Sequence, residues 1–106
     1  MEIAVQCYRA TATFPPDERF GMTSQIRRAS TSIAANIAEG HGRESTGSFI
    51  QGLRIAQGSL KELETHIILC RRVDLMDSSR SEDLLSRCDE AGRMIRGLIR
   101  KLQDTK

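Results

Sequence analysis

The sequence predicts an all-α protein, an antiparallel up-down four-helix bundle in which short connections join four amphipathic helices. Three observations predict this fold class. Apolar residues recur at spacings of three and four over long segments, as they do on one face of a helix. Aromatic residues make up 4% of the chain and tryptophan is absent, so the core must be aliphatic. There are only two prolines, whereas a sandwich or a barrel would need regular turn signals.

The size and composition narrow the classes of protein further. A chain of 106 residues has the size of one domain, and we expect residues 1–106 to form a single bundle. The formal net charge of +2 is lower than is typical of nucleic-acid-binding domains. No apolar run approaches the roughly 20 residues that span a membrane. We therefore expect a cytoplasmic protein that makes no membrane contact.

The cysteines predict a reducing environment. The chain has three, an odd number, so they cannot all pair with one another. Cys7, Cys70 and Cys88 each fall on an apolar stripe, which predicts buried free thiols in the cytoplasm. Their spacing does not match a zinc site, and we expect neither a metal nor a cofactor.

The first helix is predicted over residues 2–13. Its apolar face consists of four residues at successive spacings of four, three and four: Ile3, Cys7, Ala10 and Phe14. Pro15 and Pro16 should end the helix, because the residue before a proline is driven out of the α region. Residues 16–18 are expected to start a short turn.

The second helix is predicted over residues 23–40, with Thr23 or Ser24 as its N-terminal cap. It is crowded with small residues, which would let neighbouring helices approach closely. Its seam comprises Met22, Ile26, Ala29, Ile33 and Asn36. Gly40 is expected to end the helix in the left-handed conformation, which glycine adopts without steric cost.

The third helix is predicted over residues 46–72, capped by Ser45 or Thr46. Its core stripe alternates spacings of four and three: Phe49, Leu53, Ala56, Leu60, Leu63, Ile67 and Cys70. Four further apolar residues lie off this stripe, more than one partner face needs: Ile50, Ile55, Ile68 and Leu69. This excess predicts a homo-oligomer. Gly58 lies in mid-helix, where a glycine lowers helix stability by about 1 kcal/mol. We expect that it is there to allow another helix to approach closely.

The fourth helix is predicted to follow a loop over residues 74–78. Ser79 and Glu82 have the spacing of a capping box at its start. Its apolar stripe again alternates spacings of four and three: Leu84, Cys88, Ala91, Ile95, Leu98 and Leu102. Two such long stripes predict helix crossing angles near 20°.

Several polar and charged residues gather around the glycine end of the second helix. Asn36 lies in the apolar seam and must be hydrogen-bonded, which would fix the helix register or join it to a neighbouring backbone. Glu39 can pair with Arg43, four residues on, if the helix continues through Gly40. If the helix ends there, as we expect, Glu39 turns inward and meets Arg27, Arg28 or Arg54 in a buried network. We name the predicted set the polar cluster: Asn36, Glu39, Arg43, Arg27, Arg28 and Arg54.

The adjacent Arg27 and Arg28 point about 100° apart on a helix. One structural salt bridge and one solvated charge would explain them; a phosphate contact and a subunit contact remain alternatives. Near the C-terminus a basic stripe combines Arg93, Arg96, Arg100 and Lys101. It is either a solvated face, favoured by the helix dipole, or a surface for nucleic acid or an acidic partner. The candidate nucleic-acid-binding residues are therefore Arg27, Arg28, Arg93, Arg96, Arg100 and Lys101.

Catalysis and metal binding are weakly indicated. Glu39 with His41 could form an acid–base pair, but a general base also needs a partner and a pocket. His66 follows Glu62 by one turn, which favours a contact within the helix. A metal site in a bundle would need further ligands on another helix. We expect a protein that is not an enzyme.

The segment SQIRRASTSIAANIAEGHGR (24–43), followed by GSLKELET (58–65), resembles a known four-helix-bundle family. This family is named for proteins encoded in intervening sequences of bacterial 23S ribosomal RNA genes. The flanking segments agree, and only the last helix matches loosely. Family members usually carry additional helix before the position of Met1, so the first helix here is expected to be short and less stable.

The resemblance implies a compact helical bundle, and several members of the family form ring-shaped homopentamers. No enzymatic activity is established for the family as a whole. A related branch, the accessory protein of diversity-generating retroelements, is a basic pentamer that associates with a reverse transcriptase and binds nucleic acid. We therefore expect a non-catalytic, homo-oligomeric scaffold or adaptor, with a pentamer favoured. The alternative is an RNA- or DNA-binding protein that uses an arginine-lined surface, alone or with a nucleic-acid enzyme.

Overall fold

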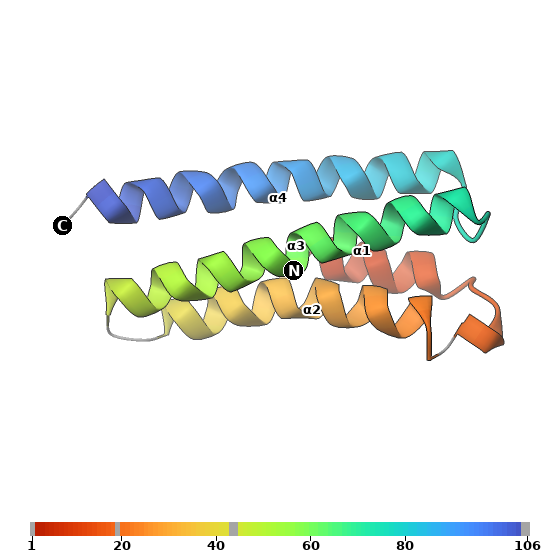
Figure 1. Cartoon of the computed structure of the whole chain (residues 1–106), viewed down its shortest axis with the longest axis horizontal. Coiled ribbons are helices and arrows are strands. Elements are labelled where there is room, and N and C mark those ends of the chain that lie inside the picture. Colours follow the sequence, from red (N-terminus) through yellow and green to blue (C-terminus); the bar gives the residue numbers. More distant parts are fainter. Residues whose placement is uncertain (1, 19, 43–44, 105–106) are drawn as a thin grey trace.

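The computed structural model describes residues 2–18, 20–42 and 45–104 of the chain (Figure 1). Within these ranges it contains helices and no strand. The elements are α1 (Glu2–Thr11), a 3-10 turn η1 (Pro16–Glu18), α2 (Met22–His41), α3 (Thr46–Arg72) and α4 (Ser78–Asp104). The all-α prediction is confirmed, and the arrangement of the four described helices is that of a bundle.

Successive long helices run in opposite directions along a body of 48 × 22 × 18 Å (Figure 1). The closest pairing is between α2 and α3, and α4 packs on α3. The ten residues of α1 contact α2 and α4 but border only the first part of α4. At 1.5 Å per residue, α1 reaches about 15 Å and α4 about 40 Å. The second half of α4 therefore packs on α3 alone.

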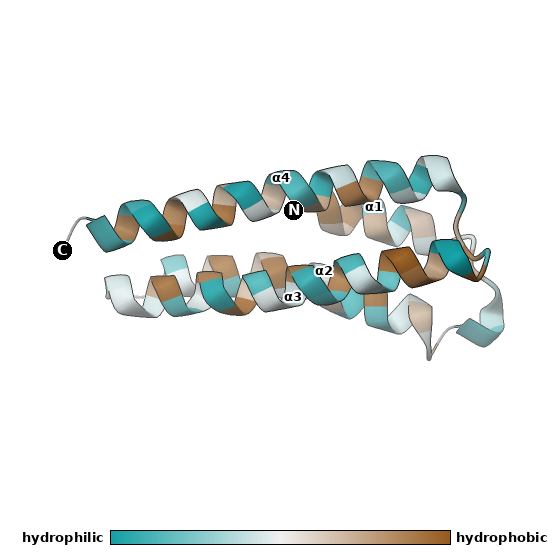
Figure 2. Cartoon of the chain, turned by 45° about the horizontal axis from the view of Figure 1, so that its top comes forward, coloured by the Kyte–Doolittle hydropathy of each residue, from teal (hydrophilic) through white to brown (hydrophobic). Residues whose placement is uncertain are grey.

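The core is aliphatic and contains all of the cysteines. Its fully buried large side chains come from every long helix: Ile26, Leu53, Leu63, Ile67 and Leu84. Figure 2 shows how hydrophobic residues recur along the helices between hydrophilic ones. The predicted stripe of α3 is confirmed, because its residues are buried apart from Phe49, which is partly buried against the core.

Several predicted helix ends are wrong. The helix α2 begins at Met22 with Gly21 as its N-cap, so neither Thr23 nor Ser24 caps it. The helix α1 ends at Thr11 and not at residue 13, because the N–H of Phe14 bonds to the Thr11 carbonyl oxygen at 3.0 Å and turns Phe14 into the core. The first turn of α4 is capped by Asp77, whose Oδ1 accepts the N–H of Arg80 at 2.7 Å. The expected capping box of Ser79 and Glu82 does not form, since α4 already begins at Ser78.

The glycines have different roles from those predicted. The helix α2 runs through Gly40 to His41, and the capping Gly42 has a φ of −75°, so neither is left-handed. Gly40 is buried against α3, and a Cβ at this position would lie only 3.3 Å from the Cα of Phe49. Gly58 is exposed, and a Cβ there would meet nothing within 4 Å. The close approach of α2 and α3 occurs instead at Gly52, where a Cβ would lie 2.6 Å from the carbonyl oxygen of Asn36.

Candidate functional site

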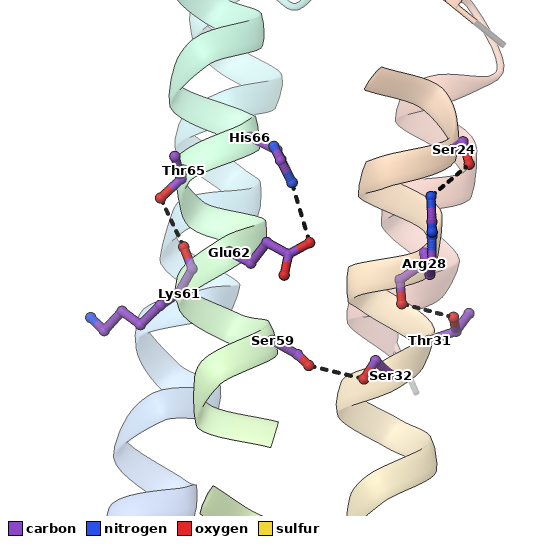
Figure 3. Close-up of polar contacts among 9 residues, drawn as sticks. All are labelled: Ser24, Arg28, Thr31, Ser32, Ser59, Lys61, Glu62, Thr65 and His66. Atoms are coloured by element: carbon purple, nitrogen blue, oxygen red, sulfur yellow. Dashed lines mark hydrogen bonds and ion pairs between the residues drawn. The ribbon is translucent and has the colours of Figure 1, made fainter. Parts of the chain in front are cut away.

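The α2–α3 side of the bundle carries a chain of polar contacts. The hydroxyl groups of Ser32 and Ser59 lie 2.9 Å apart and join the two helices (Figure 3). The amide nitrogen of Asn36 donates to the Ser32 carbonyl oxygen at 2.8 Å and to its hydroxyl at 3.0 Å. Asn36 thus bonds within its own helix and reaches α3 through Ser32, rather than bonding the neighbouring backbone as one expectation had it.

A pocket of about 240 Å³ adjoins this network, between the last turns of α2 and the first turns of α3. Asn36 and Glu39 contribute polar side chains from α2, while Ser48 and Gln51 contribute them from α3. Gly40, Gly52 and the side chain of Ile55 complete the lining. Because the two glycines add no side chain, the helices lie close together and the polar groups of both converge. We name this the polar pocket.

The predicted polar cluster does not assemble among the described residues. Glu39 is exposed and forms no ion pair with them, so its expected inward turn is wrong. The helix α2 continues past Gly40 to His41, and Glu39 lies on its exposed surface beside the polar pocket. Arg54 is exposed on α3, and Arg28 is exposed and donates to the hydroxyl of Ser24 at 3.3 Å (Figure 3). Arg43 lies outside the described residues.

Arg27 has a structural role, as expected for one of the two arginines, but it acts through a hydrogen bond and a cation–π contact and not through a salt bridge. Its Nε donates to the hydroxyl of Thr11 at 2.9 Å, and its guanidinium carbon lies 4.5 Å from the centroid of the Tyr8 ring. These contacts tie α2 to α1 through a hydrogen bond and a cation–π interaction. Tyr8 and Thr11, three residues apart on one helix face, were the available signal.

The basic stripe lies on exposed residues of α4. Arg93 is paired with Asp89, its Nη2 lying 2.9 Å from the carboxylate oxygen. Arg96 extends over Gly92, since a Cβ at that glycine would lie 3.1 Å from the Arg96 Nη1. Arg96, Arg100 and Lys101 form no ion pair within the described ranges. The stripe therefore presents these cations to solvent.

An apolar groove of about 280 Å³ opens where α1 begins. Ile3 lies at one end, and Ile33 and Ile37 of α2 face Met94 and Ile95 of α4 across it. Met94, which lines the groove, is 69% exposed.

The buried thiols are confirmed, and their chemistry is unfavourable for catalysis. Burial raises the pKa of Cys7 to about 11, with an opposing hydrogen bond from Ser30. Burial likewise raises the pKa of Cys70 to about 11 and that of Cys88 to about 12. A thiolate is the nucleophilic form of cysteine, so these groups are unreactive at neutral pH.

The histidines make local contacts. The Nε2 of His66 lies 3.5 Å from the Glu62 carboxylate on α3, which is the intrahelical pairing expected (Figure 3). The ring of His41 packs edge-on against Phe49, with centroids 5.3 Å apart, and His41 does not line the pocket that Glu39 lines. In the described ranges, no three His, Cys, Asp or Glu side chains are grouped so that they could hold a metal ion. None of the described helices is both long and apolar enough to cross a membrane.

The fold and these contacts define an all-α bundle protein whose central helix pair is joined by small and polar side chains. The chain belongs to the 23S rRNA-intervening sequence protein family, whose model matches residues 1–97. It is also similar to a crystal structure from Bacteroides thetaiotaomicron VPI-5482, described as a protein with unknown function from the S23 ribosomal protein family. The two share 29% sequence identity and a TM-score of 0.82 over 92% of each chain. No curated protein matches the sequence significantly. The family resemblance drawn from the sequence is confirmed.

Proposed function

We propose that this protein is a single-domain, non-catalytic scaffold or adaptor that acts as a homo-oligomer, with a pentameric ring as the favoured assembly. The observation that carries the proposal is the exposure of large apolar side chains, which range from 38% for Val5 to 69% for Met94 and 88% for Phe20. Burying such surface between copies stabilises an assembly by roughly 25 cal/mol per Å².

Exposed apolar residues lie along one side of α3. Ile55 of α3 and Val73, the residue that caps the C-terminus of α3, are 18 residues apart, about five helical turns, which places their backbones on the same side of the helix axis. Leu69 lies close to that line, and all three are between 44% and 55% exposed. We name these residues the α3 stripe. It continues the α2–α3 side of the bundle, which makes that side the best-supported subunit interface.

Several features support a role without catalysis. The cysteines are buried, and burial raises their pKa values to about 11 and 12. The structural neighbour is described as a protein with unknown function. Three buried free thiols also favour a reducing compartment, and we infer a cytoplasmic location.

Light scattering coupled to size exclusion tests the assembly directly. We expect a particle mass that is a multiple of the chain mass of 11.8 kDa, and a fivefold multiple for the ring. Changing Leu69 and Val73 to serine should shift the protein toward monomers. A wild-type monomer at micromolar concentration overturns the proposal.

A second function, RNA or DNA binding, is supported by the cations of α4. Arg96, Arg100 and Lys101 are exposed, and a ring would repeat them around its axis. Arg27 is a weaker candidate than expected because Thr11 and Tyr8 already engage it. Arg28 remains exposed on α2. Binding should weaken steeply with salt and be lost when Arg93, Arg96 and Arg100 become glutamine. No mobility shift with structured RNA at low salt would exclude this function.

A further inference from the structure

The polar pocket presents hydrogen-bond acceptors and a negative charge. The amide nitrogen of Asn36 is occupied by Ser32, which leaves its Oδ1 as an acceptor. The Glu39 carboxylate has no ion-pair partner, and the Gln51 amide no hydrogen bond, within the described residues. An arginine side chain is a suitable occupant, because its planar guanidinium offers five donors to carboxylate and carbonyl oxygens.

The basic stripe of α4 offers such a side chain. Arg100 is exposed one helical turn after Arg96, and it has no ion-pair partner among the described residues. Arg93 is less suitable because Asp89 already neutralises it. Within one chain the pocket and Arg100 lie on different helices, the pocket on α2 and α3 and the arginine on α4.

The placement of these two features suits a ring. The last turns of α2, the first turns of α3 and the C-terminal part of α4 all lie at the same end of the bundle (Figure 1). A rotation about an axis parallel to the bundle would therefore bring the pocket of one copy level with the arginine of the next. Contacts between two different faces are heterologous, and they close into rings when the rotation closes.

We infer, on the basis of the homo-oligomer proposed above, that the polar pocket of one copy receives the Arg100 side chain of a neighbouring copy. The guanidinium pairs with the Glu39 carboxylate and donates to the side-chain oxygens of Asn36 and Gln51. Arg96 adds positive charge beside it. Ile55 on the pocket rim, 46% exposed, contributes apolar contact around the ion pair. The occupant is thus a second copy of this chain.

Charge exchange between the two faces tests the pairing. Glu39→Arg and Arg100→Glu should each weaken association by about thirtyfold or more, because each leaves a charge unpaired in the interface. The double variant carrying both changes should recover most of the wild-type association. An equal mixture of the two single variants should recover association between unlike copies, since Glu39 of one variant can pair with Arg100 of the other. The recovery should be partial for a ring of five, because two variants cannot alternate around an odd number of interfaces. Association constants come from dilution series followed by light scattering.

A matched control lies at the other end of the bundle. Glu82→Arg on α4 makes the same charge change as Glu39→Arg at an exposed position far from the pocket and should leave association unchanged. Circular dichroism confirms that each variant is folded. If wild type assembles and Glu39→Arg assembles equally well, this interface is overturned while the oligomer stands.

Each of the other results of the association experiment leads to a different conclusion. A wild-type monomer overturns both the oligomer and the interface. If both single variants associate more weakly than wild type and the double variant does not recover association, the two faces do not meet each other. This result overturns the pairing. Loss of RNA binding by Arg100→Glu, with an unchanged particle mass, assigns the arginine to nucleic acid instead. Glu39→Arg separates these roles because it leaves every arginine of α4 in place.

Discussion

Gly52 of α3 faces the carbonyl oxygen of Asn36 on α2 with no room for a side chain between them. A Cβ at Gly52 would lie 2.6 Å from that oxygen and 3.3 Å from the Cα of Gly40. Both obstacles are backbone atoms, which cannot turn aside as a side chain can. The α2–α3 pairing and the polar pocket beside it therefore depend on a residue without a Cβ at this position.

Replacing Gly52 with alanine should lower the free energy of unfolding by about 1–3 kcal/mol, because the helices must separate locally. Gly58→Ala is the matched control on the same helix, since a Cβ there meets nothing within 4 Å. It should raise the free energy of unfolding by up to about 1 kcal/mol through helix propensity. Urea unfolding measures both, and equal effects would contradict the close approach.

The Ser32–Ser59 hydrogen bond should couple the two helices energetically. Ser59→Ala should cost about 0.5–1.5 kcal/mol of unfolding free energy, because the Ser32 hydroxyl loses its partner across the interface. With both serines replaced by alanine, the loss should be smaller than the sum of the single losses. A double-mutant cycle measures this difference, and strict additivity would show that the bond contributes nothing.

Arg27 and Arg28 are adjacent, but we expect replacement of Arg27 to lower the stability of the protein much more than replacement of Arg28. Arg27→Gln removes the hydrogen bond to Thr11 and the cation over Tyr8, and should cost about 1–2 kcal/mol. Arg28→Gln alters an exposed side chain and should change stability by less than about 0.5 kcal/mol. Thermal unfolding distinguishes them, and similar midpoints for the two variants would contradict the proposed tie between α1 and α2.

The buried thiols make stability fall at alkaline pH. Below pH 9, the ordinary pKa of cysteine, both folded and unfolded chains retain the thiol protons. Between about pH 9 and 11 the unfolded chain releases protons that folded Cys7 and Cys70 still bind, so the free energy of unfolding decreases as pH rises. Urea unfolding at pH 8 and pH 10 tests the direction. Replacing Cys7 by alanine should reduce the difference, because one buried thiol is removed.

The long helical stripes were predictable from sequence because spacing is a local property. Leu53, Leu63 and Ile67 were assigned to the core of α3 and are fully buried. The glycine role was assigned to the wrong residue, although the helical spacing distinguishes the two positions. Gly52 lies within about 60° of the apolar stripe of α3 and faces the backbone of Asn36, whereas Gly58 lies on the opposite side of the helix and faces open space. How closely α2 approaches at Gly52 depends on the packing of the two helices.

The candidate site was predicted in part. Asn36 was correctly expected to be hydrogen-bonded, because an amide in an apolar seam needs partners. The inward turn of Glu39 was wrong because its distance from the arginines of other turns and helices depends on how α2 and α3 pack, and Glu39 lies exposed at the polar pocket between them. The contact of Arg27 with Thr11 depends on how α1 crosses α2, which a single sequence does not encode locally.

The helix α4 has two parts that differ in their packing and therefore in local stability. Its first half is held between α1 and α3, whereas its second half rests on α3 alone and leaves Met94 mostly exposed. Segments with fewer buried apolar contacts open at lower free energy than the whole domain. Backbone amides of α4 beyond Met94 should therefore exchange with deuterium sooner than those near Leu84. Anything that binds beside Met94 would slow that exchange, so the rate reports occupation of the groove.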